Sequence, residues 1–246
     1  MMLRRRQAVL ALLVLVAGTL GAPVSQGIAA AQRGDCGHPT VDVVFDDPAE
    51  LDMACRALTD ITAYFRGMGF EVAPRVSLRF ADRPADRSAD DASRHGYFDR
   101  GRSQIVAYRT SDVSPWGLPW TPQLAGSFLR HELAHMAVWE AIDRDRSRLR
   151  REWHEFIAYA VQLDLMEPQL REKILAVQAQ VRPFANLAGV NEFTSRMDPD
   201  VFAVAAYRTY LARGSAKFVA SLLRGEVVPP PFSYPFPVLP SEVPSQ

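Results

Sequence analysis

The amino-acid sequence predicts an α+β fold, with a short sheet that includes antiparallel strands in the first half and helices in the second. Short runs of β-branched and aromatic residues occur before residue 110, which is typical of strands. From residue 121 onward, apolar residues recur at three- and four-residue steps, the period of a buried helix face. Strands followed by helices, instead of strands alternating with helices, indicate the α+β class.

Strands are expected at residues 41–45, 75–80 and 103–109. Between the first two, a helix is expected to begin at Pro48, after the N-cap Asp47, and to end near Gly67. The polar segment 81–96 contains almost no large apolar side chain and therefore predicts a loop. This loop is either a solvated excursion or a mobile flap near a cleft.

The second half is expected to be helical after the aromatic turn "SPWGLPW". Its predicted helices cover residues 122–143, 149–166, 169–181, 199–213 and 216–223. The segment 229–246 is rich in proline and cannot form a helix or a central strand, so we expect it to pack along the surface. One domain, at residues 32–228, therefore precedes this tail.

The first 31 residues have the features of a secretory signal peptide. A positive start, "MMLRRR", precedes the apolar run "AVLALLVLVAGTLGA", and "IAAAQ" offers small residues for cleavage after Ala31. The alternative is an uncleaved anchor, but a spanning helix needs about 20 apolar residues, and Gly18, Gly21 and Pro23 interrupt this run. We therefore expect a periplasmic or secreted protein without stable membrane insertion after cleavage.

Export decides how the two cysteines, Cys36 and Cys55, are interpreted. In an oxidising compartment they are expected to form a disulfide between the mature N-terminus and the following helix, worth about 3 kcal/mol. The alternative is that both are metal ligands, but the C-x-x-C spacing of zinc ribbons is absent.

The amino-acid composition limits the classes of partner that the protein is expected to bind. Hydrophobic residues make up 48% of the 246 residues, and 28 basic residues are interleaved with 28 acidic ones, so the formal net charge is zero. Nucleic-acid binders concentrate basic residues in runs or on one face. The sequence therefore argues against a nucleic-acid partner, and it does not indicate an oligomeric state.

The segment "HELAH" places two histidines four positions apart on a predicted helix. His131 and His135 then project from one face, about 6 Å apart, which a zinc ion about 2.0–2.1 Å from each nitrogen can bridge. Glu132 is offset by about 100° and suits a general base beside the metal. The alternative is a pair of histidines on a polar helix face. The surrounding residues are apolar, however, and burying titratable groups without partners is costly.

Nineteen residues separate His135 from Glu155 on the next predicted helix. H-E-x-x-H followed by such a glutamate resembles the gluzincin branch of the zinc metallopeptidases, the thermolysin-like arrangement, and the wider peptidase-MA-like group. The resemblance covers residues 128–159. It implies a zincin-like fold, with zinc held by His131, His135 and Glu155 and with Glu132 as general base.

The sequence departs from the thermolysin-like pattern at two positions. His154 replaces the asparagine before the third ligand, and it is a rival ligand to Glu155, which we favour because of the interval and the small Ala158 that follows. Tyr159 stands four residues after Glu155, and the aspartate that would orient a ligand histidine is missing. The Tyr159 hydroxyl is a candidate for that role.

Other site features stay open at the level of sequence. Strand 103–109 either holds an extended substrate over the active-site helix or is sheet core. His38 and His95 are expected at the surface. Candidate donors to a developing oxyanion are, by residue type alone, Tyr159, Tyr207, Tyr210 and His154.

These features predict an exported zinc-dependent metallohydrolase, a peptidase acting on peptides or proteins. Zinc would acidify a water molecule, and Glu132 would take its proton and pass it to the leaving amine. The first alternative is a zinc-binding protein of the same fold without turnover, a scaffold or inhibitor. The second is a structural envelope protein in which "HELAH" is incidental.

Overall fold

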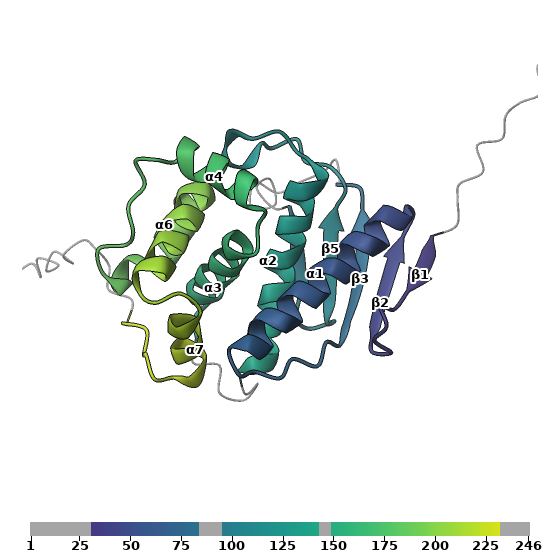
Figure 1. The fold of residues 1–246 in the computed structure, drawn as a ribbon, viewed down its shortest axis with the longest axis horizontal. Coiled ribbons are helices and arrows are strands. Elements are labelled where there is room, and N and C mark those ends of the chain that lie inside the picture. Colours follow the sequence, from purple (N-terminus) through teal and green to yellow (C-terminus); the bar gives the residue numbers. More distant parts are fainter. Residues whose placement is uncertain (1–30, 84–94, 143–148, 232–246) are drawn as a thin grey trace, which may run out of the picture. The chain divides into compact units, whose positions relative to one another are not determined.

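A mixed sheet lies at one side of the part of the chain that the computed structural model describes, residues 31–83, 95–142 and 149–231 (Figure 1). Within these ranges five strands pair in the order β1–β2–β3–β5–β4. Their bounds are β1 (Gln32–Gly34), β2 (Val41–Phe45), β3 (Val76–Ala81), β4 (Gly96–Asp99) and β5 (Gln104–Tyr108). The three predicted strands are confirmed as β2, β3 and β5, and the α+β class is confirmed with them.

The central strands β2, β3 and β5 run parallel, while β1 and β4 pair antiparallel with their neighbours. The sequence does not predict β1 and β4, because three and four residues are too short to show an alternating pattern. Strand β5 lies between β3 and β4, and its Ile105 and Val106 are buried. Of the two interpretations of strand 103–109, the structure therefore has sheet core, and β4 is the edge strand beside β5.

Helices account for most of the remaining described residues. Their bounds are α1 (Pro48–Gly67), α2 (Pro122–Ala141), α3 (Arg151–Asp164), α4 (Pro168–Val177), α5 (Glu192–Met197), α6 (Pro199–Ala212) and α7 (Ala216–Arg224). All six predicted helices are confirmed, although α4 ends at Val177 instead of residue 181. The sequence does not predict α5, which has only six residues.

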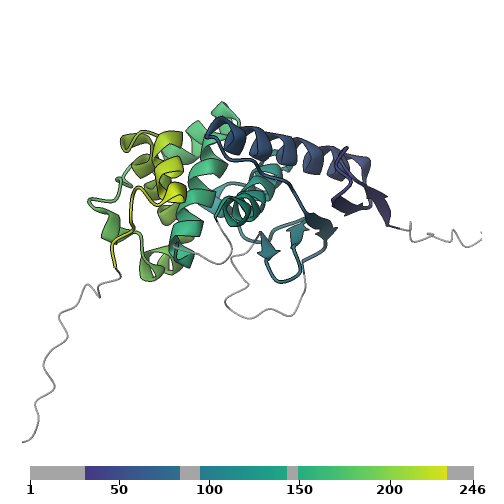
Figure 2. The same ribbon diagram turned by 90° about the horizontal axis from the view of Figure 1, so that it is seen from below.

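Helices α1 and α2 cover one face of the sheet, and α3 and α6 pack outward from α2 (Figures 1 and 2). Helix α2 thus lies between the sheet and α3, which explains why apolar residues surround it on nearly all sides. The N-terminus of α1 is closed by a capping box in which Asp47 accepts from the amide of Ala49 and the Glu50 side chain accepts from the backbone amide of Asp47.

The predicted disulfide between Cys36 and Cys55 is confirmed and joins the β1–β2 turn to α1. The disulfide lowers the conformational entropy of the unfolded chain. The Cys36→Ser/Cys55→Ser double variant is therefore expected to lose about 3 kcal/mol of unfolding free energy. This corresponds to a fall of about 6–12 °C in Tm for a chain of this size, measurable by calorimetry. An unchanged Tm in the double variant would contradict the prediction.

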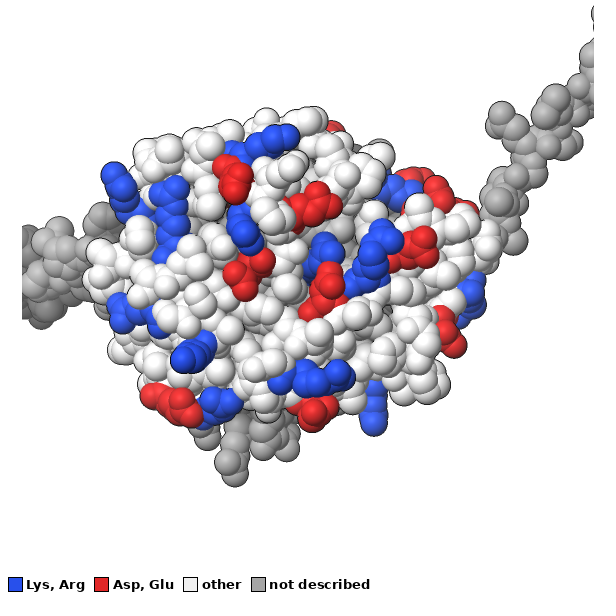
Figure 3. Space-filling model, in the orientation of Figure 1, with Lys and Arg blue, Asp and Glu red and all other residues white. Residues whose placement is uncertain are grey.

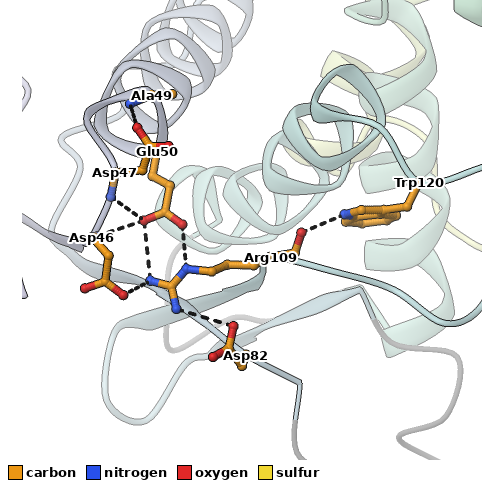
Figure 4. A network of polar contacts seen from close by, with 7 residues as sticks. All are labelled: Asp46, Asp47, Ala49, Glu50, Asp82, Arg109 and Trp120. Carbon is orange, nitrogen blue, oxygen red and sulfur yellow. Dashed lines mark hydrogen bonds and ion pairs between the residues drawn. The ribbon is translucent and has the colours of Figure 1, made fainter. Parts of the chain in front are cut away.

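A network of polar contacts fixes the chain where it leaves β5 (Figure 4). The Arg109 side chain donates to Glu50 of α1 and to Asp46 after β2, each over 2.6 Å, and Asp82 after β3 lies 3.6 Å away. The hydrogen bond to Glu50 is the largest cause of the raised pKa of Arg109. Trp120 donates its indole N–H to the Arg109 carbonyl over 2.9 Å. The network therefore ties the ends of three parallel strands to the loop that leads into α2.

Several sequence predictions fall outside the described residues: most of the signal peptide, most of the 81–96 loop and the tail from residue 232. These stay predictions. Within the described ranges, no helix has the length and apolar character needed to cross a membrane. On the face that Figure 3 shows, arginine and lysine side chains are interspersed with aspartate and glutamate.

Candidate metal centre

Helix α2 carries the "HELAH" segment in its largely buried middle part. Thr121 caps the helix by accepting from the amide of Leu124, and Pro122 occupies the first turn. His131 and Glu132 have only 5% and 9% of their surface exposed. Two titratable side chains are thus buried in an otherwise apolar helix, which requires a compensating interaction.

The structure brings His131, His135 and Glu155 together. The two Nε2 atoms lie 3.1 Å apart, and Oε2 of Glu155, from α3, lies 3.4 Å from Nε2 of His131 and 3.5 Å from Nε2 of His135. The ligand atoms of a tetrahedral zinc ion lie about 3.3–3.5 Å from one another, because each is about 2.0–2.2 Å from the ion. The three side chains therefore fit a metal ion of this size, although the triangle does not decide which metal it is.

Glu155 and His135 each shift the pKa of the other toward its charged form. Burial by itself would raise the pKa of Glu155, but the neighbouring His135 and His131 outweigh burial and hold that pKa well below its usual range. Burial alone would lower the pKa of His135, but the charge of Glu155 and the hydrogen bond to it raise the pKa. Glu155 is accordingly ionised, which is the form that a metal ligand needs.

His154, the rival third ligand, does not join the group formed by the other three residues. Adjacent helix residues point about 100° apart, so when Glu155 faces the histidines of α2, His154 is directed elsewhere. It lines the same cleft, and its pKa is lowered to about 4, first by burial and then by the charge of His135. His154 is therefore a neutral imidazole beside the triad.

Glu132 lies against the edge strand. A Cβ atom built on Gly96 of β4 would come within 3.4 Å of the Glu132 Cγ and 2.7 Å of the Val106 carbonyl oxygen. The contact that excludes a side chain here is the one with the Val106 carbonyl of β5, whereas the contact with Glu132 is close to an ordinary van der Waals distance. Glu132 lines the same cleft as the triad and does not belong to the three-residue group.

The close approach at Gly96 leads to a prediction. Gly96→Ala is expected to displace β4 or Glu132 and to cost about 1–3 kcal/mol of unfolding free energy. Gly67→Ala is a matched control, because a Cβ there would meet nothing within 4 Å. Thermal unfolding of the two variants, with zinc content measured beside it, tests this. Equal stability of both would show that β4 does not depend on the missing side chain.

The second sphere of the triad differs from the expectation for Tyr159. The ring of Tyr159 packs on the ring of His131, with centroids 4.3 Å apart, and within the described residues the buried Nδ1 of His131 has no hydrogen-bond partner. For His131, the Tyr159 hydroxyl therefore does not fill the orienting role for which it is a candidate. Burial, and then the charges of Glu155 and Asp200, raise the pKa of Tyr159 well above its usual value, so its hydroxyl stays a donor.

The candidate oxyanion donors separate into two groups. Tyr159 and His154 line the cleft. Tyr210 donates to Asp164 over 2.8 Å and contacts Tyr64, and Tyr207 stacks on Tyr210, so these two tyrosines belong to the packing between helices.

The prediction that His95 is a surface residue is wrong. Its ring packs on Phe128 and Trp120, with centroids 4.2 and 5.3 Å apart, and it lines the cleft. Burial is the first cause that lowers its pKa to about 4. Because β4 is not predicted, the sequence gives no reason to place the residue just before it inside. His38 lies half-exposed in the β1–β2 turn.

The cleft that contains the triad has a volume of about 680 Å³. Its walls come from β4, α2, the first turns of α3, and α5. Helix α5 contributes Glu192 and Arg196, which sequence reasoning missed because the helix has too few residues for a periodic pattern.

Comparison with known proteins identifies the family without a function. A family model described as a family of unknown function, DUF6639, matches residues 41–230, which includes strands β2 to β5 and all seven helices of the described residues. No curated protein and no solved structure matches the chain. The match covers more than half of the 246 residues, so the chain belongs to the DUF6639 family.

Proposed function

We propose that this protein is an exported zinc-dependent metallohydrolase with a zincin-like fold, and that it acts as a peptidase on peptide or protein substrates. The triangle formed by His131 Nε2, His135 Nε2 and Glu155 Oε2, with sides of 3.1–3.5 Å, carries the proposal. Glu132 supports it, because this buried carboxyl group lines the same cleft.

Zinc is the metal that the donor set favours. Two imidazole nitrogens and one carboxylate oxygen are the ligands of many catalytic zinc sites, and three protein ligands leave a coordination position open. Sites that prefer magnesium or calcium are built from oxygen ligands instead.

A bound zinc ion would supply Lewis acidity toward a carbonyl group and a water molecule. Glu132 would accept a proton from the attacking water and deliver it to the leaving amine. Tyr159, which lines the cleft and keeps its hydroxyl proton, would donate a hydrogen bond to the developing oxyanion, whereas the single N–H of the neutral His154 is engaged by the Leu149 backbone.

The position of β4 beside the cleft supports a peptide as substrate. Strand β4 borders the cleft and pairs only with β5 among the described strands, so its outer edge offers backbone groups to an extended chain. The disulfide supports export, because such bonds persist in oxidising compartments.

The proposal is tested by removing and restoring the metal. The mature protein is expected to cleave members of a broad peptide library, to stop after treatment with a chelator, and to recover with about one equivalent of zinc per chain. Mass spectrometry of the peptides gives the readout. Cleavage that persists in metal-free protein would overturn the proposal.

A zinc-binding protein without turnover is the second candidate. Within the described residues the buried Nδ1 of His131 lacks the acceptor that usually orients a ligand histidine, and the lack of such an acceptor lowers activity. One zinc ion per chain with no cleavage across the library would select this function, a scaffold or inhibitor.

A further inference from the structure

One arginine in the wall of the cleft has no carboxylate partner within the described residues. Arg100, in the turn between β4 and β5, lies with its guanidinium carbon 4.0 Å from the ring centroid of Trp139 on α2, and both residues line the cleft. A guanidinium that lies against an aromatic ring keeps its N–H edge available for a carboxylate. Arg100 is thus exposed and held against Trp139, and no carboxylate of the described residues takes up its N–H donors.

Two other arginines, in contrast to Arg100, each have a carboxylate partner. Arg102, two residues further on, pairs with Asp99 over 3.2 Å. Arg196, which also lines the cleft, is paired with Glu192 over 2.9 Å. Asp99 and Glu192 thus neutralise the charges of Arg102 and Arg196. The charge of Arg100 is not neutralised in this way by the described residues.

A second cation lies beside the triad. Arg151, at the start of α3, lines the cleft, and its contact is with Oε1 of Glu155 over 3.9 Å. The other oxygen of Glu155 faces the two histidines, so this carboxylate is shared with the metal triad. Glu152, also in the cleft wall, is already paired with Arg150 over 3.0 Å. Within the described residues Arg100 has no carboxylate partner and Arg151 has only this long contact, so both guanidinium groups can engage a ligand.

We propose that Arg100, held by Trp139, forms with Arg151 a carboxylate-binding subsite beside the metal triad. The substrates of the cleft are then peptides that carry a carboxylate near the bond to be cleaved. The carboxylate belongs either to an Asp or Glu side chain or to the C-terminus of a short peptide, and both sources present the same chemistry to arginine. That these ligands are substrates rests on the proposed function. Binding of a carboxylate by the two arginines does not require turnover.

A binding experiment tests the subsite without depending on catalysis. The zinc-loaded Glu132→Gln protein is titrated with acetylated, amidated alanine heptapeptides that carry one Glu at successive positions, and with the same peptides carrying Gln. A third set carries Gln and a free C-terminal carboxylate. At one position Glu, or in the third set the free carboxylate, is expected to bind about tenfold more tightly than the neutral peptide.

Two further substitutions in the same background show whether Arg100 is responsible. Arg100→Gln is expected to remove the tenfold preference while zinc content stays at that of the parent protein. Arg102→Gln, in the same turn and outside the cleft wall, is expected to keep it. Equal affinity for all three peptide sets, or a preference that survives Arg100→Gln, would overturn the inference.

Cleavage of the same peptides by the protein with Glu132 intact separates the two proposals. Hydrolysis without preference for a carboxylate would overturn the subsite and leave the peptidase proposal standing. Carboxylate-selective binding that is lost in Arg100→Gln, together with no hydrolysis of any peptide, would support the subsite and overturn the peptidase proposal.

Discussion

Replacing Glu155 by alanine is expected to remove the zinc ion from the protein, whereas replacing His154 by alanine is not. The Glu155 Oε2 atom lies within 3.5 Å of both histidine Nε2 atoms, and among the described residues it is the carboxylate that groups with them. Changes in the residues around metal ligands already cost 10–100-fold in affinity, so loss of a ligand is expected to cost more than about 100-fold. Zinc per chain after dialysis against a zinc buffer, measured by elemental mass spectrometry, gives the answer.

His154→Ala is the matched control for this experiment, because the two residues are adjacent on α3 and both line the cleft. Circular dichroism of each variant establishes that the fold is intact. Loss of zinc in His154→Ala with retention in Glu155→Ala would reverse the assignment of the third ligand. Absence of zinc from the unaltered protein in metal-replete conditions would make the structural envelope protein the better interpretation.

Replacing Glu132 by glutamine is expected to leave zinc bound and to lower kcat/KM for a cleaved peptide by about 10²–10⁴-fold. Glutamine keeps the size and the hydrogen-bonding oxygen of glutamate, but it cannot accept a proton at neutral pH. Glu132 is not part of the three-residue group, so its change leaves the ligand atoms unaltered. Steady-state kinetics on one identified peptide, with zinc content determined in parallel, test the prediction.

Glu140→Gln provides a control on the same helix, since Glu140 does not line the cleft. This variant is expected to retain the kinetic constants of the parent protein. A Glu132→Gln protein with full activity would rule out Glu132 as the general base, and another group in the cleft would have to be sought.

The features that could be predicted from sequence are those set by local interactions. Helix α2 is recognisable because its apolar period is continuous and Thr121 and Pro122 mark its beginning. The same 3.6-residue period places His131 and His135 on one face without reference to the rest of the chain. The disulfide was predictable for a different reason, because two cysteines allow one pairing.

The features that could not be predicted depend on contacts between distant segments. Strand β4 has four residues and exists through its pairing with β5, and helix α5 has six, too few for the apolar period to show. The error for His95 has the same origin, since its burial comes from Trp120 and Phe128, which follow in later segments. Short elements carry little local signal, and tertiary packing decides whether they form.

By itself, the sequence determined the α+β class, the helix face that carries two histidines, and Glu155 as the favoured third ligand. The tertiary structure decided that Glu155, and not its neighbour His154, approaches both imidazoles, and that Arg100 rests on Trp139 at the rim of the cleft. Those outcomes depend on how α3 crosses α2 and on how β4 lies along the sheet. Local periodicity specifies which face of a helix is buried, but distances across an interface follow from the side chains of both partners packing together.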